Sequence, residues 1–196
     1  MAESNLKVAF DRFDTLNAAD PRQTDVDGVL QPTELVYALR MSQWLHRLAP
    51  DASEPLQLAA RSQHLMRWMI PRDSYPQDRA GYLKWRTTLY DFHADRSAEV
   101  LHEVGYGDAT IARVRSLIRK EQLKTDPDAQ ALEDVICLVF LDHYFAEFAA
   151  GHDEAKLIRI LQRTWKKMSP RGQDAALKLN FSPPQRALIL KALAGE

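Results

Sequence analysis

Apolar residues recur at every third or fourth position along almost the whole chain, which is the spacing of an amphipathic helix. No run of alternating apolar and polar residues rich in β-formers is bounded by hairpin turns. The pattern therefore predicts an all-α fold, a bundle of several helices.

The first predicted helix is marked by Leu6, Phe10, Phe13 and Leu16. The segment that follows it, "NAADPRQTDVDGVLQ", is polar and covers residues 17 to 31. A loop of this length is uncommon in a compact domain, so we expect it to be either functional or mobile.

Prolines and capping residues delimit the next helices. Pro32 opens a helix that ends before Pro50, and Ser53 precedes another helix that is predicted to continue to Met69. The longest helical pattern, residues 77 to 104, ends at Gly105. Further helices are predicted over 108 to 120, from Asp126 through "AQALEDVICLVFLDHYFAEFA", over 153 to 168, over 170 to 179, and from Ser182 onward.

The helix after Asp126 is apolar around most of its circumference, which predicts that it lies at the centre of the bundle. A length of 196 residues fits one domain well. We therefore expect a single helical domain over residues 1–196, with a core of about residues 32–150 on which the C-terminal helices 153–195 pack.

The charge balance excludes a strongly basic protein, because 26 Lys and Arg stand against 27 Asp and Glu. Nucleic acid or an anionic membrane would need a local basic patch. The single cysteine, Cys137, lies in "VICLVFL" and is predicted to be a core residue, which implies a reducing compartment. The first residues, "MAESNLKVAFDRFD", do not resemble a signal peptide, so a cytoplasmic protein is expected.

Two predicted helices bring histidines and arginines into one segment. Arg79, Arg86 and His93 are spaced seven apart and form a stripe along the long helix. On the preceding helix the same rule puts Arg61 and His64 on one face with Trp68, and Arg67 lies one turn from His64.

If these two helices pack as an antiparallel pair, His64 and His93 approach each other beneath a fringe of arginines. Arginine suits phosphate because its planar guanidinium can form two parallel hydrogen bonds. The alternative is that the arginines are solvated and the histidines are structural, as on an ordinary amphipathic helix.

A second basic segment is "RVRSLIRKEQLK", residues 113 to 124, in which Lys120 and Lys124 are further candidates for phosphate binding. The alternative is a solvated helix face, since cations are favourable near a helix C-terminus.

Glu133 and Asp134 interrupt the most apolar helix. A buried carboxylate is costly unless it caps a helix, pairs with a cation or binds a metal. Both residues are therefore candidate catalytic acids, and Asp134 is the favoured one of the two.

The stretch "HADRSAEVLHEVGYGDATIARVRSLIRKEQ", together with "QHLMRW", resembles the histidine-aspartate (HD) superfamily of metal-dependent phosphohydrolases. The resemblance implies an HD-like helical fold and metal ligands at His64, His93 and Asp134. No His-Asp dipeptide lies between His64 and Asp134, and Arg119-Lys120 stands where many members have a later histidine. The implied centre thus holds one Mn, Fe or Zn ion per chain, or none.

At closer range, the segments "RSQHLMRWMIPRDSYPQDRAGYLKWR", "FHAD" and "LKTDPDAQALEDVICLVFLDHYF" resemble domain-of-unknown-function family 4202. That resemblance covers most of the chain and implies no particular reaction.

Three functions remain open. The first is a metal-dependent phosphohydrolase, or a relative that binds a nucleotide or another phosphorylated small molecule through Arg61, Arg67, Arg79, Arg86, Lys120 and Lys124. The second is a non-catalytic helical binding or adaptor module, which the missing dipeptide favours. The third is RNA binding through the basic and aromatic residues, against which the near-neutral net charge argues.

Overall fold

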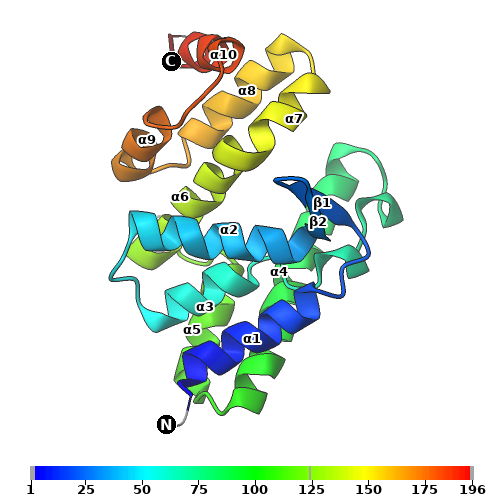
Figure 1. The fold of residues 1–196 in the computed structure, drawn as a ribbon, viewed down its shortest axis with the longest axis vertical. Helices are drawn as coiled ribbons and strands as arrows, with labels where there is room; N and C mark the ends of the chain where they lie inside the picture. The colour runs from blue at the N-terminus through cyan, green and yellow to red at the C-terminus, as the bar shows by residue number, and fades with distance from the viewer. Residues whose placement is uncertain (1–2, 124, 195–196) are drawn as a thin grey trace.

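The computed structural model describes residues 3–123 and 125–194 of the chain (Figure 1). Within these residues the fold is all-α apart from one small hairpin, as predicted. The helices are α1 (Asn5–Asn17), α2 (Thr33–Leu48), α3 (Glu54–Ser62), α4 (Arg79–Val104), α5 (Asp108–Ile118), α6 (Pro127–Val139), α7 (Phe145–Ala150), α8 (Glu154–Trp165), α9 (Pro170–Leu177) and α10 (Pro183–Ala194).

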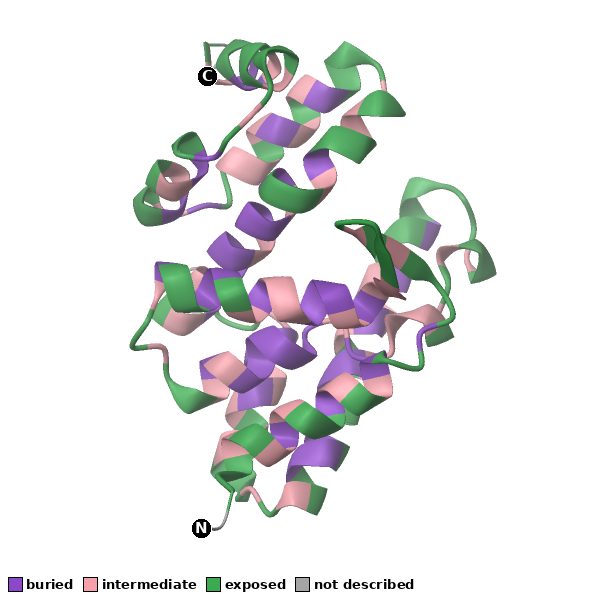
Figure 2. Ribbon diagram, in the orientation of Figure 1, coloured by how far each residue is buried: buried purple, intermediate pink, exposed green. Residues whose placement is uncertain are grey.

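Figure 1 shows α1 to α5 at the N-terminal end of the molecule and α8 to α10 at the other, with α6 extending between them. The helix α6 packs against α2 and α9, and its Leu132, Val135 and Leu138 are almost completely buried. Cys137 is buried as predicted, and burial raises the pKa of its thiol to about 12. Buried residues, purple in Figure 2, occur from α1 to α10 and belong to one continuous core, so the described residues form a single domain.

Several helix ends follow the predicted local chemistry. The carboxylate of Asp78 accepts the backbone N–H of Gly81 at 2.7 Å and caps α4. At the other end of α4, Gly105 has φ +92°, the left-handed conformation that glycine adopts without strain.

The prediction of a structureless loop after α1 was wrong. Residues Gln23–Val26 (β1) and Val29–Pro32 (β2) form an antiparallel hairpin in which Gln23 pairs with Pro32 and Val26 with Val29. Asp27 and Gly28 form its turn, with φ of 53° and 83°. An Asp-Gly pair is a strong hairpin signal, and the short strands around it do not alternate clearly enough to reveal it.

The helix predicted to continue to Met69 ends instead at Ser62. The hydroxyl of Ser62 donates to the Leu58 carbonyl at 2.8 Å, and Met66 then adopts a left-handed φ of 56°. The amide oxygen of Asn17 in α1 accepts the Met66 N–H at 3.0 Å. Two short 3-10 turns, Arg67–Met69 and Arg72–Ser74, complete the connection to α4.

The long apolar helix was also predicted as one uninterrupted element. It is divided by a π-helical turn, Phe140–Tyr144, between α6 and α7. Such turns insert one extra residue and are frequent near functional sites.

Candidate functional site

His64 lies at the centre of a polar cluster formed by the 62–67 turn, α2 and α4. Its ring stacks on that of Tyr37, with centroids 4.0 Å apart and planes inclined by 12°. Nη1 of Arg67 lies 3.0 Å from His64 Nε2, and Oε2 of Glu34 lies 3.4 Å from Nδ1. The predicted common helical face for Arg61, His64 and Trp68 does not exist, because α3 ends before His64.

The surroundings keep His64 neutral. Burial lowers the pKa of His64 well below its usual range, and the positive charges of Arg67, Lys120, Arg22 and Arg86 lower it further. A guanidinium can only donate, so a ring nitrogen of the neutral His64 accepts from Arg67, whose Nη1 lies 3.0 Å from Nε2 and 3.2 Å from Nδ1.

His93 approaches His64 as predicted, with ring centroids 5.8 Å apart. Its side chain is 2% exposed, and Nδ1 donates to the Leu65 carbonyl at 2.9 Å. Burial, followed by the neighbouring His64, lowers the pKa of His93 to about 3. Nε2 of His93 is buried and has no hydrogen-bond partner among the described residues, which is costly for a polar atom.

Arg67 and Arg86 are half-buried cations beside this pair. The Arg67 guanidinium lies 5.0 Å from the centroid of the Trp85 ring, and Arg86 donates to the Tyr90 hydroxyl. In the described part of the chain neither guanidinium forms an ion pair with a carboxylate. The two charges are thus held near His64 without being neutralised.

Lys120 and Glu133 continue the cluster on the other side of Tyr90. The Lys120 ammonium lies 5.7 Å from the Tyr90 ring centroid and pairs with Glu133, which Lys167 also approaches at 3.4 Å. Burial raises the pKa of Glu133, but the two lysines outweigh burial and the net pKa is lowered. Glu133 is therefore an anion that holds Lys120 in place. Lys120 has a φ of 59°, a strained conformation for a non-glycine residue.

Asp134 is separate from the two histidines and lies between α6 and α9. Its Oδ1 accepts the backbone N–H of Ser169 at 2.7 Å and the Gln130 amide at 3.0 Å, and its Oδ2 accepts the Ser169 hydroxyl. Adjacent helical residues point about 100° apart, which explains why Glu133 faces the cluster and Asp134 does not.

Of the four arginines predicted to bind phosphate, Arg67 and Arg86 lie in the cluster, whereas Arg61 and Arg79 lie outside it. Arg61 is 8% exposed and forms two hydrogen bonds with Asp14, at 2.8 and 2.5 Å, so its charge is already compensated. Arg79 is exposed at the first turn of α4, two turns from Arg86. Lys124 lies outside the described residues.

The basic segment after residue 112 is neutralised by acidic neighbours. Arg113 pairs with Asp126 and Asp128, whereas Arg115 and Arg119 both pair with Asp95. This part of α5 therefore presents less positive charge than its sequence indicates.

Sequence reasoning missed Arg22, Glu34 and Tyr37. Arg22 bonds Asp20 and Glu34 at the base of the hairpin, and Glu34 connects it to His64. The only signal in the sequence was an acidic residue in the first turn of α2, which is also the ordinary preference at a helix N-terminus.

The resemblance to the HD superfamily implied a metal held by His64, His93 and Asp134. The structure brings the histidines together, but both Asp134 oxygens are bound to Ser169. Among residues 3–123 and 125–194, no group of three or more His, Cys, Asp or Glu could hold a metal ion. These residues therefore do not fit the implied metal centre.

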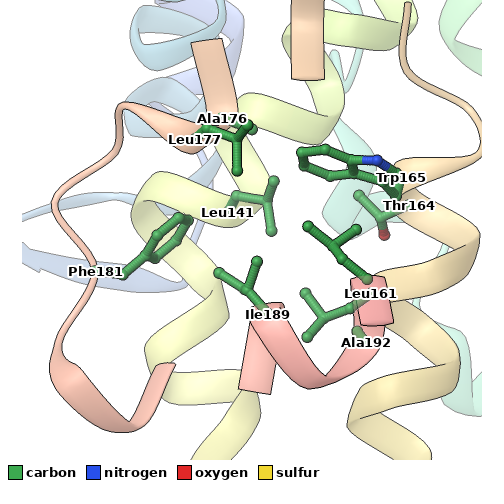
Figure 3. Close-up of a pocket in the computed structure, with 10 residues that line it drawn as sticks. Leu141, Leu161, Thr164, Trp165, Ala176, Leu177, Phe181, Ile189 and Ala192 are labelled. Carbon is green, nitrogen blue, oxygen red and sulfur yellow. The ribbon is translucent and has the colours of Figure 1, made fainter. Parts of the chain in front are cut away.

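Two cavities lie away from the cluster. One, of about 10 Å³, is the apolar space between α8, α9 and α10 that includes Leu141, Trp165 and Phe181 (Figure 3). It has room for about one water molecule. The other, of about 180 Å³, lies between α1, α2 and α3 and is lined by Phe10, Ser42 and Leu45 among others.

Within the described residues, no helix is both long enough and apolar enough to cross a membrane. No curated protein and no solved structure matches the chain. A family model described as "Domain of unknown function (DUF4202)" matches residues 7–189, which is nearly the whole chain, so the protein belongs to this family.

Proposed function

We propose that this protein binds a phosphorylated small molecule or nucleotide at the cluster formed by His64, Arg67, Arg86 and Lys120. The observation that supports this function is the pair Arg67 and Arg86, two half-buried guanidinium groups without a carboxylate partner among the described residues. Buried cations normally have an anionic partner, and here a ligand would supply it.

The charge of a phosphomonoester matches this arrangement. Such a group carries a charge of about −1.5 to −2 at pH 7, close to the two uncompensated positive charges. The planar guanidinium of each arginine can present two donors to phosphate oxygens. Trp85, Tyr82 and Tyr90 pack against the guanidinium groups and limit their rotamers, which reduces the entropy lost on binding.

His64 supports the same proposal because burial, followed by the cations around it, lowers its pKa. A histidine that stays neutral contributes no further repulsion between positive groups, and its Nε2 orients Arg67 in the ligand-free state. Metal-dependent hydrolysis of the bound phosphate would need a third metal ligand beside the two histidines, because both Asp134 oxygens bind Ser169.

The test is isothermal titration calorimetry with inorganic phosphate and with adenosine monophosphate. We expect Arg67→Gln and Arg86→Gln each to weaken binding about tenfold or more, the effect of losing a charge-assisted hydrogen bond. Arg159→Gln, an exposed arginine on α8, is the matched control. Equal affinities in the three variants would show that the cluster is not the binding site.

A further inference from the structure

We propose that the ligand of this cluster also carries a hydroxyl group that donates a hydrogen bond to Nε2 of His93. The ligand is then a phosphomonoester of a polyol or sugar, including the sugar of a nucleotide, and not a simple alkyl phosphate. This inference rests on the proposed phosphate-binding function and adds the chemical class of the ligand.

The first step is the tautomer of His93. The Leu65 carbonyl can only accept a hydrogen bond, so the ring nitrogen 2.9 Å from it, Nδ1, carries the proton. In a neutral imidazole the other nitrogen, Nε2, then bears a lone pair and can only accept. The ligand group that satisfies Nε2 must therefore be a donor.

The second step is that Nε2 lacks such a donor. Its buried, unpartnered state is shared by only three other side-chain atoms in the part of the chain that the structure describes: Asn17 Nδ2, Ser42 Oγ and Tyr144 Oη. Amide nitrogens donate, and hydroxyls both donate and accept. His93 Nε2 is the one obligate acceptor of the four.

The third step is position. His93 lies beside His64, with ring centroids 5.8 Å apart, and the charges of Arg67 and Glu34 both act on it. The Arg67 guanidinium, which we propose binds the phosphate, contacts the other histidine of the pair and lies 3.0 Å from His64 Nε2. Because Arg67 contacts His64 and the His64 and His93 ring centroids are 5.8 Å apart, we expect a ligand with a few bonds between its phosphate and its hydroxyl to reach both groups.

Phosphate oxygens cannot satisfy Nε2, because a phosphate dianion only accepts hydrogen bonds. Arg67, Arg86 and Lys120 are all donors and match those oxygens. A hydroxyl next to the phosphate supplies the missing donor. One small molecule can therefore bind the three cations through its phosphate and His93 Nε2 through its hydroxyl.

The experiment compares glycerol 3-phosphate with propyl phosphate by isothermal titration calorimetry. The two share the phosphomonoester and the three-carbon chain and differ in their hydroxyl groups. We expect the unmodified protein to bind glycerol 3-phosphate about tenfold more tightly.

His93→Asn is the informative variant, because the Asn amide can still donate to the Leu65 carbonyl from the position of Nδ1 while Nε2 is deleted. It should bind both compounds with the affinity that the unmodified protein shows for propyl phosphate. His93→Gln restores an amide oxygen near the position of Nε2 and should recover part of the preference for glycerol 3-phosphate. It is also the variant to test if His93→Asn does not fold.

The outcomes separate the two proposals. Equal affinity for the two compounds in the unmodified protein, or an unchanged preference in His93→Asn, overturns the role of His93 and leaves phosphate binding intact. If neither compound binds, while Arg67→Gln also behaves like the unmodified protein, the proposed function itself fails.

Discussion

Asp134 binds Ser169 through both of its carboxylate oxygens. The backbone N–H of Ser169 donates to Oδ1 at 2.7 Å, and the Ser169 hydroxyl donates to Oδ2. Ser169 is the N-cap of α9 and its hydroxyl also accepts the N–H of Gly172 at 3.2 Å. The carboxylate in α6 thus fixes the start of α9, which makes Asp134 a structural residue of the junction between these helices.

Replacing Asp134 by Ala should destabilise the protein. The change leaves the Ser169 N–H and the Gln130 amide without their acceptor, and hydrogen bonds to charged groups contribute about 1.5–3 kcal/mol each. We expect the free energy of unfolding, measured by urea denaturation, to decrease by about 3 kcal/mol. A change below about 0.5 kcal/mol, the ordinary effect of a surface substitution, would refute this role.

Gly172 should be coupled to Asp134. A Cβ atom added at Gly172 would lie 2.7 Å from Cγ and 2.8 Å from Oδ1 of Asp134, too close for either group to stay in place. Gly172→Ala should therefore cost more stability in the unmodified protein than in Asp134→Ala, where the clashing atoms are gone. A double-mutant cycle should give a coupling of about 1–2 kcal/mol, and strictly additive effects would contradict the contact.

His93 should make stability depend on pH. The unfolded histidine has a pKa of 6.5, whereas His93 in the folded protein has a pKa of about 3. Between these values the unfolded chain binds a proton and the folded chain does not, so the folded state loses stability as the pH falls. From pH 7 to pH 5 this loss should be about 2 kcal/mol for His93 alone, with a further loss in the same direction from His64.

The measurement is urea denaturation at a series of pH values in the unmodified protein and in His93→Asn. The variant removes the titrating group, so its free energy of unfolding should fall less steeply between pH 7 and pH 5. Parallel curves for the two proteins would show that His93 has the same pKa in the folded protein as in the unfolded chain.

Local chemistry predicted most helix boundaries but not the course of the chain between α3 and α4. Pro32 and Gly105 delimit their helices through local backbone chemistry, because proline fixes φ and glycine adopts a left-handed φ without strain. The end of α3 depends instead on Asn17, which binds the Met66 N–H from a helix far away in sequence. No periodicity in the 53–69 segment carries that information.

The candidate site was predictable to a similar extent. The approach of His64 and His93 was expected only if their two helices packed as an antiparallel pair, and it occurs although His64 does not lie on a regular helix. The sequence favoured Asp134, but it is Glu133 that faces the cluster. The partners that separate the two acids, Ser169 and Lys120, come from other segments of the chain. Which face of α6 meets which helix is decided by tertiary packing alone.

Arg61 should prove structural and not ligand-binding. Its side chain is 10% exposed and that of its partner Asp14 is 28% exposed. Asp14→Ala leaves a largely buried guanidinium unpaired and should cost about 3 kcal/mol of unfolding free energy, whereas Arg61→Met, which removes the charge and keeps the aliphatic stem, should cost less. Titration of Arg61→Met with inorganic phosphate should give the affinity of the unmodified protein. A tenfold weaker affinity would show that Arg61 takes part in phosphate binding.

Metal content provides the last prediction. Two neutral histidines can contribute two ligands, but a transition-metal centre in a protein usually has at least three, and here Asp134 cannot serve as the third without releasing Ser169. We therefore expect elemental analysis of the purified, untagged protein to give well below one Mn, Fe or Zn per chain, with no increase in melting temperature when these ions are added. A full equivalent of metal that disappears in His93→Ala would mean that Glu34, 3.4 Å from His64, rearranges to complete a three-ligand centre. That result would favour metal-dependent hydrolysis over binding alone, because a metal-bound water can act as a nucleophile at neutral pH.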